Sequence, residues 1–266
     1  HPKEGETATV GSLTPAELRT FHRQYYVARN AAVIIVGALD RDGAADVAER
    51  ILAGLPSGAA APAIPPLPAA APGRELRLPF SSSQTHLLCG LPVLAADDPD
   101  RFALLVGNHI LGGSGLNSRI ANEIRGRRGL AYSAYSVLAP WRGPGPFLMG
   151  LQTANAQAEA ALAVLRQTLN EFIANGPTEA ELVAARRHLI GSFPVRLAGN
   201  RQLAEQLADM AVYRLPLDYL ETWPARVAAV SAEDVRRAFQ RRIRLEALHT
   251  VMLGGPASEA GALAVP

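Results

Sequence analysis

The segment from Arg125 to Tyr132 has the residue types and the spacing best suited to chemistry in this sequence. Arg125 stands at the end of a predicted helix, and Tyr132 stands seven positions later at the start of a predicted strand. Gly126 and Gly129 allow a tight reversal between them, so that the two side chains can converge on one cleft. A guanidinium and a phenol hydroxyl together can hold a peptide carbonyl and stabilise negative charge that develops on it. The alternative interpretation is an ordinary solvated basic turn.

The run Gly112-Gly113-Ser114-Gly115 is a second candidate, because it separates two predicted helices. Backbone N–H groups at a helix N-terminus can bind phosphate. However, the run lacks the Gly-Lys-Ser/Thr ending of a phosphate-binding loop, and it does not follow a strand. Two other interpretations stay open: a plain helix–helix turn, or a flexible loop that touches an extended peptide.

The histidines do not form a recognisable zinc motif. They stand at positions 1, 22, 86, 109, 188 and 249. The sequence contains neither H-E-x-x-H nor the inverted H-x-x-E-H, since Gly5 replaces the second histidine after His1-Pro2-Lys3-Glu4. His86 and Cys89 lie three positions apart on a predicted strand, which sends their side chains to opposite faces. Because catalytic zinc generally needs three protein ligands, we expect the chain by itself to bind no stoichiometric zinc and to cleave no peptide.

The composition is that of a folded protein with balanced charge. Among its 266 residues 48% are apolar and 19% are charged, and 26 basic residues face 24 acidic ones, a net charge of +2. This excludes a disordered chain and disfavours a nucleic-acid-binding one. No apolar run reaches the length of a membrane span. The single cysteine, Cys89, excludes an intrachain disulfide and is expected to be a buried structural thiol whose pKa burial raises. Since the chain starts with His1-Pro2, we interpret it as a fragment or processed product, with any targeting signal in the part before it.

The predicted elements interleave helices and strands, which is typical of an α/β fold. In the first segment we expect a helix over 14–26, a buried strand over 31–39 and a helix over 41–52. A proline-rich linker occupies 56–74. Beyond it we expect strands over 75–80, 85–91, 132–138, 147–153 and 248–253. The predicted helices there are 99–111, 116–125, 156–174, 178–197, 200–213, 217–227 and 231–242. Residues 1–55 are expected to be an incomplete domain, because one helix–strand–helix unit cannot cover both faces of a sheet, whereas 75–266 are expected to be complete.

The sequence around Arg125 closely resembles the pitrilysin/insulinase-type M16 peptidases, and more narrowly the second domain of a bacterial M16B protein. The resemblance is carried by Val106–Gly113, Ser118–Ile120, Glu123–Arg125 and Gly129–Ser133. Further matches cover nearly the whole chain: His1–Thr14, Tyr25–Tyr26 and Asn30–Gly37 resemble the end of the family's first domain, and Ser83–His86, Gly176–Thr178 and Leu215–Tyr219 resemble parts of its second.

This resemblance implies a fold like that of mitochondrial processing peptidase: an antiparallel-rich mixed sheet covered by helices. It implies a pair of domains or subunits that close on a peptide. One of them holds zinc through H-x-x-E-H and a distal glutamate, and the other supplies an arginine and a tyrosine. By motif position Arg125 and Tyr132 resemble that pair, and Gly112, Gly113, Ser114 and Gly115 resemble a short form of the substrate-contacting glycine loop. Zinc is then expected in a missing N-terminal part or in a partner subunit, in a homo- or heterodimer. The expected compartment is the periplasm, with the cytoplasm as the alternative.

Three functions stay open at this point. The chain is part of an M16 zinc peptidase or of its metal-free partner subunit, and the wording of Gln84–His86, Gly112–Gly115 and Leu215–Tyr219 favours the partner type. Alternatively, it is a noncatalytic scaffold of the same fold that keeps the arginine and tyrosine by descent. The third possibility is an unrelated small-molecule-binding domain that uses the glycine run.

Overall fold

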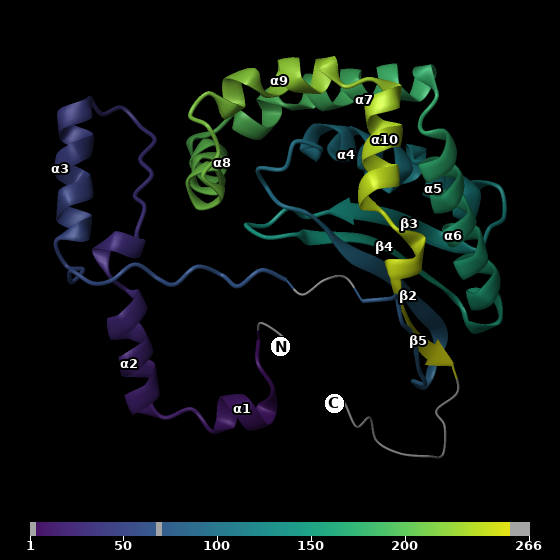
Figure 1. Ribbon diagram of the computed structural model, residues 1–266, viewed down its shortest axis with the longest axis horizontal. Coiled ribbons are helices and arrows are strands. Elements are labelled where there is room, and N and C mark those ends of the chain that lie inside the picture. The colour runs from purple at the N-terminus through teal and green to yellow at the C-terminus, as the bar shows by residue number, and fades with distance from the viewer. Residues whose placement is uncertain (1–3, 68–70, 256–266) are drawn as a thin grey trace. The chain divides into compact units, whose positions relative to one another are not determined.

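The computed structural model describes residues 4–67 and 71–255 (Figure 1). The chain divides into two compact units. The first comprises His1–Pro65 with Leu197–Ala211, and the second comprises Pro66–Arg196 with Val212–Pro266. None of the described helices is both long and apolar enough to cross a membrane.

The first unit consists mainly of helices. They are α1 (Thr7–Gly11), α2 (Pro15–Tyr25), α3 (Arg41–Leu52) and most of α8 (Asn200–Tyr213). The predicted start of α2 is confirmed. Glu17 N donates to Thr14 Oγ1 at 3.3 Å, and the Glu17 carboxylate accepts from Thr14 N at 2.8 Å. Asp40 caps α3 by accepting from Gly43 N at 2.8 Å.

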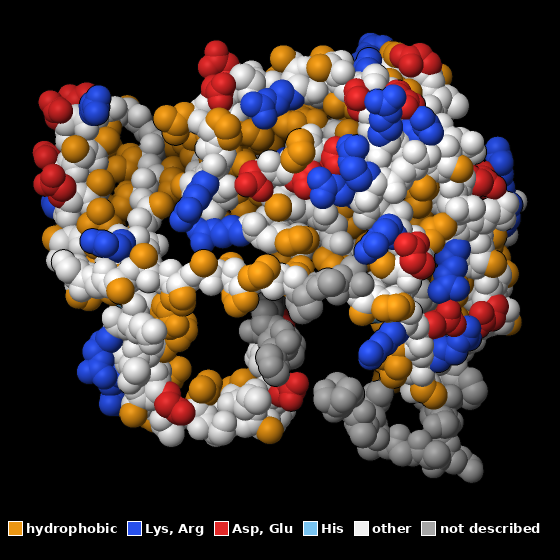
Figure 2. Space-filling view, viewed as in Figure 1, with side chains coloured by type: hydrophobic (Ala, Val, Ile, Leu, Met, Phe, Trp, Pro, Cys, Tyr) orange, Lys and Arg blue, Asp and Glu red, His pale blue; other side chains and the backbone are white. Residues whose placement is uncertain are grey.

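The buried strand predicted over 31–39 is wrong. Residues 31–39 form no helix, are exposed or half-buried, and pair with no strand of the described chain. A strand needs a neighbour for its N–H and C=O groups, so an apolar run by itself does not produce one. Among the described residues of this unit, Val27 and Met210 are the buried apolar side chains, whereas Leu18, Phe21 and Ile51 are more than half exposed. Figure 2 shows such apolar side chains on the surface.

The second unit is built on a mixed five-stranded sheet, as the fold class predicts. The strands are β1 (Glu75–Leu78), β2 (Ser82–Leu94), β3 (Ala131–Leu138), β4 (Gly145–Ala154) and β5 (His249–Gly255). Their order across the described sheet is β1-β5-β2-β4-β3. β1 and β5 run parallel, and the other neighbouring strands are antiparallel. The five strands predicted for this part of the chain are therefore confirmed, with some of their ends shifted.

Helices α4 (Arg101–Asn108), α6 (Ala158–Asn175) and α10 (Ala232–Arg242) cover one face of the sheet (Figure 1). The core between them contains Phe147, Phe172 and Phe239, which are fully buried. The Phe239 ring meets the other two edge-on, at 6.4 and 4.8 Å between centroids. These rings belong to a larger set of buried apolar side chains between the helices and the sheet, whose removal from water drives the folding of this unit.

The remaining helices are α7 (Glu179–Ser192), α9 (Tyr219–Ala229) and the short α5 (Arg119–Ala121). Predicted caps at Thr178 and Ser231 are confirmed as capping boxes. Two predicted helices end early or break up. The helix expected over 99–111 changes into a π-helical turn over His109–Gly113, and the one expected over 116–125 is α5 followed by a π-helical turn over Asn122–Gly126.

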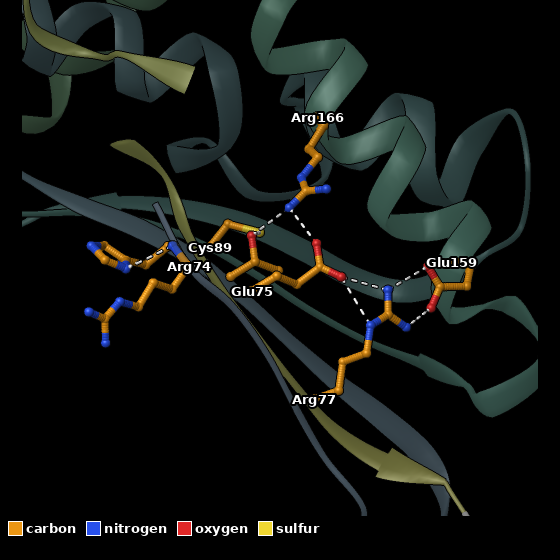
Figure 3. A network of polar contacts seen from close by, with 8 residues as sticks. Arg74, Glu75, Arg77, Cys89, Glu159 and Arg166 are labelled. Carbon is orange, nitrogen blue, oxygen red and sulfur yellow. Dashed lines mark hydrogen bonds and ion pairs between the residues drawn. The ribbon is translucent and has the colours of Figure 1, made fainter. Parts of the chain in front are cut away.

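A network of charged groups fastens the edge strand β1 to its neighbours (Figure 3). Glu75 accepts hydrogen bonds from Arg77 and Arg166, and Arg166 also donates to Thr250 Oγ1 at 3.0 Å. Arg77 extends the network to Glu159 on α6. Each pair is partly solvated and weak by itself, but together they link β1, β5 and α6.

Cys89 on β2 is fully buried, as predicted, whereas His86 on the same strand is exposed. The Cys89 thiol is 3.5 Å from Thr250 Oγ1. Burial raises the pKa of the Cys89 thiol and outweighs the opposing hydrogen bond to Thr250.

We therefore predict that Cys89 is inert in the native protein. The folded chain should react with Ellman's reagent at least ~100-fold more slowly than the chain in urea, because the thiolate is the reactive form and the site is closed. The measurement is absorbance at neutral pH, with Cys89→Ala as the blank. Equal rates for folded and unfolded chain would contradict the burial.

Candidate functional site

The turn between α5 and β3 brings Arg125 and Tyr132 together. The guanidinium carbon of Arg125 lies 4.8 Å from the centroid of the Tyr132 ring, a cation–π contact. Two backbone hydrogen bonds close the turn: Gly129 N donates to Arg125 O at 3.1 Å, and Leu130 N donates to Ile124 O at 2.8 Å. Gly129 has φ +61°, which favours glycine. The reversal expected from the sequence is thus present.

Arg125 differs from the other two arginines of this turn in its charge environment. Arg127 forms an ion pair with Glu123 at 2.8 Å, and Arg128 pairs with the same carboxylate. Arg125 has no carboxylate partner within the described residues. Tyr132 is 81% exposed, and no hydrogen bond to another described residue holds its hydroxyl. The pair therefore presents free donors to solvent.

Arg119 anchors the segment that precedes Arg125. Its Nε and Nη2 donate to the two carboxylate oxygens of Glu181, each at 2.6 Å, and its Nη2 also donates to Gly176 O at 3.1 Å. The Arg119 guanidinium lies 5.0 Å from the Phe172 ring centroid. This bidentate pair ties α5 to α6 and α7, so the turn that carries Arg125 starts from a fixed point.

Glu181 has two structural tasks. Its carboxylate binds Arg119, and it completes the capping box of α7 by accepting from Thr178 N at 2.8 Å. Burial alone would raise the pKa of Glu181, but the hydrogen bonds from Arg119 and Thr178 outweigh it and lower the pKa to about 2. The charged form is therefore the one that the fold requires.

The glycine run is held against the strand that carries Tyr132. Gly112 is buried, and a Cβ added there would lie 2.3 Å from Ser136 N on β3. Asn108 reinforces the contact by accepting from Ser136 Oγ at 2.7 Å. Gly113 and Gly115 are exposed, and Gly115 has φ +64°. The run is followed by a 3-10 turn and the three-residue α5 rather than by a long helix, which disfavours a phosphate-binding loop.

The structure also pairs two histidines whose proximity the sequence does not indicate. The rings of His109 and His188 stack with 4.9 Å between centroids. Burial, together with the neighbouring His188, lowers the pKa of His109. Within residues 4–67 and 71–255, no group of three His, Cys, Asp or Glu side chains is arranged to hold a metal ion. The described residues thus do not fit a catalytic zinc ion.

Comparison with known proteins identifies the family. The family model described as the peptidase M16 inactive domain matches residues 12–189, so this chain belongs to the M16 peptidase family. The crystal structure of a peptidase M16 inactive domain from Pseudomonas fluorescens superimposes with a TM-score of 0.92 at 34% identity, covering 98% of this chain and 62% of that one. The predicted family and fold class are confirmed.

Curated relatives are longer than this chain. An uncharacterized zinc protease of Streptomyces coelicolor is 30% identical over 244 residues, which cover 88% of this chain and 52% of that protein. The chain thus spans about half the length of such relatives. The non-peptidase homolog YmxG of Helicobacter pylori is 32% identical over 130 residues, or 47% of this chain and 29% of that protein.

We predict that Gly112→Ala destabilises the second unit by about 2 kcal/mol or more, because the new methyl group collides with the backbone of β3. Urea unfolding followed by circular dichroism measures the change. Gly191→Ala is the matched control. That glycine lies in α7 with nothing within 4 Å of an added Cβ, so the substitution should leave stability equal or slightly raised. Equal stabilities for both variants would refute the close contact.

We predict that Glu181→Gln lowers the free energy of unfolding by about 2 kcal/mol at pH 7. Glutamine keeps the capping box, so the loss reports on the charge. Because folding lowers the pKa of Glu181 from 4.5 to about 2, its contribution is fully present above about pH 5 and disappears as the pH falls through 2. The difference in free energy of unfolding between wild type and Glu181→Gln should therefore shrink as the pH falls from 5 to 2.

The control is Glu233→Gln, which removes a carboxylate whose partners Arg236 and Arg237 lie on an exposed helix face. Solvent screens that cluster, so its effect should be smaller at every pH. If the stability difference between wild type and Glu181→Gln stays constant down to pH 2, the lowered pKa of Glu181 does not stabilise the fold.

Proposed function

We propose that this chain supplies the wall of an M16 peptidase that binds the peptide and stabilises the scissile carbonyl, with Arg125 and Tyr132 as the catalytic pair. The observation that carries the proposal is the arrangement of Arg125. It is the arginine of its turn without a carboxylate partner among the described residues, and it lies over the ring of an exposed tyrosine. Glu123 binds both neighbouring arginines through its one carboxylate, which leaves one unpaired guanidinium beside one unpaired phenol.

The chemistry follows from the donors that this pair offers. Arg125 lies over the ring and its guanidinium donates to no other described residue, so its N–H groups are available for a peptide carbonyl. The Tyr132 hydroxyl adds a second donor. When the carbonyl carbon is attacked, negative charge collects on its oxygen, and the donors bind that oxygen more strongly than the starting carbonyl. The exposed Gly113 and Gly115, with Ser114 between them, contact the substrate backbone close to β3.

Activation of water belongs to another part of the assembly. The described residues offer no three-ligand metal site, so we assign that step to zinc held by a portion of the protein beyond this chain or by an M16 partner subunit. Two findings support this arrangement: the family model is that of an inactive M16 domain, and relatives named zinc proteases are about twice as long. We propose a peptide as the substrate and the periplasm as the compartment, with the cytoplasm as the alternative.

A second candidate is a noncatalytic M16 scaffold. The name of the Helicobacter pylori relative, a non-peptidase homolog, favours it. In a scaffold the Arg125–Tyr132 contact is only a packing feature, and its loss should leave any peptidase activity of the assembly unchanged.

We predict that Tyr132→Phe lowers kcat/KM of the assembled, zinc-bearing peptidase about 10²–10³-fold, the usual effect of deleting one transition-state donor. The ring that contacts Arg125 remains, so the melting temperature should stay within about 1 °C. Arg125→Lys keeps the charge but loses the planar fork, and it should also fall well below wild type. The measurement uses a quenched fluorescent peptide.

Arg127→Ala is the matched control, because Arg127 belongs to the same turn but pairs with Glu123. It should retain near wild-type activity. If Tyr132→Phe is fully active while Arg127→Ala is inactive, the assignment fails. If all three variants are as active as wild type, the scaffold is the better account.

A further inference from the structure

Three arginines converge on one buried aromatic cluster at the outer helices of the second unit. The cluster consists of Phe102 on α4, Phe193 after α7, and Tyr219 and Trp223 on α9; all except the half-buried Phe102 are buried. Helices α4, α7 and α9 contact one another, and Figure 1 shows α9 beside α7. Phe193 and Trp223 stack with 4.3 Å between centroids and an interplanar angle of 5°. The Phe102 ring lies 6.1 Å from that of Tyr219 and 6.4 Å from that of Trp223.

Each arginine lies over a ring of this cluster. The guanidinium carbon of Arg101 is 5.0 Å from the Tyr219 ring centroid, and that of Arg226 is 5.6 Å from the Phe102 centroid. Arg196 covers the stacked pair, at 4.8 Å from Trp223 and 5.3 Å from Phe193. The aromatic rings therefore hold three guanidinium groups in place. Arg101 Nη1 also donates to Ala96 O at 2.5 Å, and the other N–H groups of the three arginines have no acceptor among the described residues.

No carboxylate balances these charges within residues 71–255. Asp98 and Asp100, which precede Arg101, are bound by Arg241 and Arg242. Asp218, which precedes α9, and Glu221, in its first turn, form no ion pair with any of the three arginines. Most arginines of this unit whose side chains form polar contacts bind carboxylates, so a cluster of three without one is unusual.

The charges are also close enough to act on one group. Each of the three arginines lies over a ring of the cluster that contains Tyr219, and the Tyr219 and Trp223 rings both lie within 6.4 Å of the Phe102 ring. In agreement with this, all three arginines oppose the burial that raises the pKa of Tyr219. Burial of the guanidinium lowers the pKa of Arg196, which means that its charge is partly desolvated. Arg196 and Arg226 are nevertheless exposed residues and Arg101 is half-buried, so a small ion can reach them from solvent.

We propose that Arg101, Arg196 and Arg226 form a binding site for a phosphate group. A tetrahedral dianion offers several acceptor oxygens to forks that approach from three elements, and it offsets the mutual repulsion of the three charges. A monocarboxylate, with two oxygens and one charge, satisfies fewer of these donors. The site is separate from the peptidase role proposed for Arg125 and Tyr132.

The fluorescence of Trp223 tests the site directly, because its indole lies under Arg196. The chain has two tryptophans, so the 266-residue chain with Trp141→Phe leaves Trp223 as the reporter. We expect inorganic phosphate to change its emission saturably, whereas sodium chloride at the same ionic strength does not. A response that chloride reproduces would overturn the proposal.

Substitutions locate the response. Arg196→Gln and Arg226→Gln should each raise the apparent phosphate Kd about tenfold or more. Arg237→Gln removes the same charge from an arginine that is paired with Glu233, and it should stay within about twofold of the parent. Circular dichroism in chloride shows that each variant is folded. Equal weakening by Arg237→Gln would mean that only net charge matters and would refute the site.

Two further ligands define its chemistry. Succinate that binds as tightly as phosphate would overturn the phosphate assignment. Glycerol 3-phosphate that binds more tightly than inorganic phosphate would support the site and assign it to organic phosphate monoesters, and the reverse order would support it as a site for the free ion.

Discussion

The bidentate ion pair between Arg119 and Glu181 is the contact on which the arrangement of the second unit's site depends. One carboxylate caps α7 and holds the first residue of α5, and Arg119 in turn lies over Phe172 in the core. A helix of three residues has almost no stability of its own, so α5 keeps its place through such contacts. The turn that follows carries Arg125, and its orientation toward β3 starts from this anchor. The half-buried setting makes the pair stronger than a surface ion pair, because its hydrogen bonds outweigh the desolvation of Glu181.

The arginines of this protein differ in whether a carboxylate balances their charge. Several arginines that join elements have carboxylate partners: Arg166 binds Glu75, and Arg241 binds Asp100. Arg142 and Arg186 join elements by donating to backbone carbonyls instead. Arginines that face solvent from aromatic rings, as Arg125 and Arg196 do, have none among the described residues. A ring face orients a guanidinium without using its hydrogen-bond donors, so stacking prepares the group for an external ligand. The peptide-binding and phosphate-binding proposals rest on this same physical distinction at different places in the fold.

Some glycines in this unit are required because they have no side chain, and others because they can adopt a positive φ. Gly112 lets a π-helical turn approach the backbone of β3, where any side chain would collide. Gly150 does the same on β4, where an added Cβ would lie 2.6 Å from the Tyr135 hydroxyl. Gly129 instead supplies the positive φ that closes the turn after Arg125. Gly112 in the glycine run is therefore buried against β3, whereas Gly113 and Gly115 are exposed. The difference arises because a neighbouring strand packs against Gly112.

Local signals determined much of this protein from sequence alone. Capping boxes at Thr14, Thr178 and Ser231 act within four residues, so they place helix starts correctly, and alternation along β2 puts Cys89 inside and His86 outside. The approach of Arg125 to Tyr132 was also predictable, since a glycine turn joins them. Tertiary structure decided everything that needs a distant partner. The apolar run after Ala31 forms no strand without a neighbouring strand, and the cluster around Tyr219 assembles from three helical segments far apart in the chain. Charge pairing between elements is of the same kind, since Arg119 and Glu181 lie 62 residues apart in the chain and meet only in the folded unit.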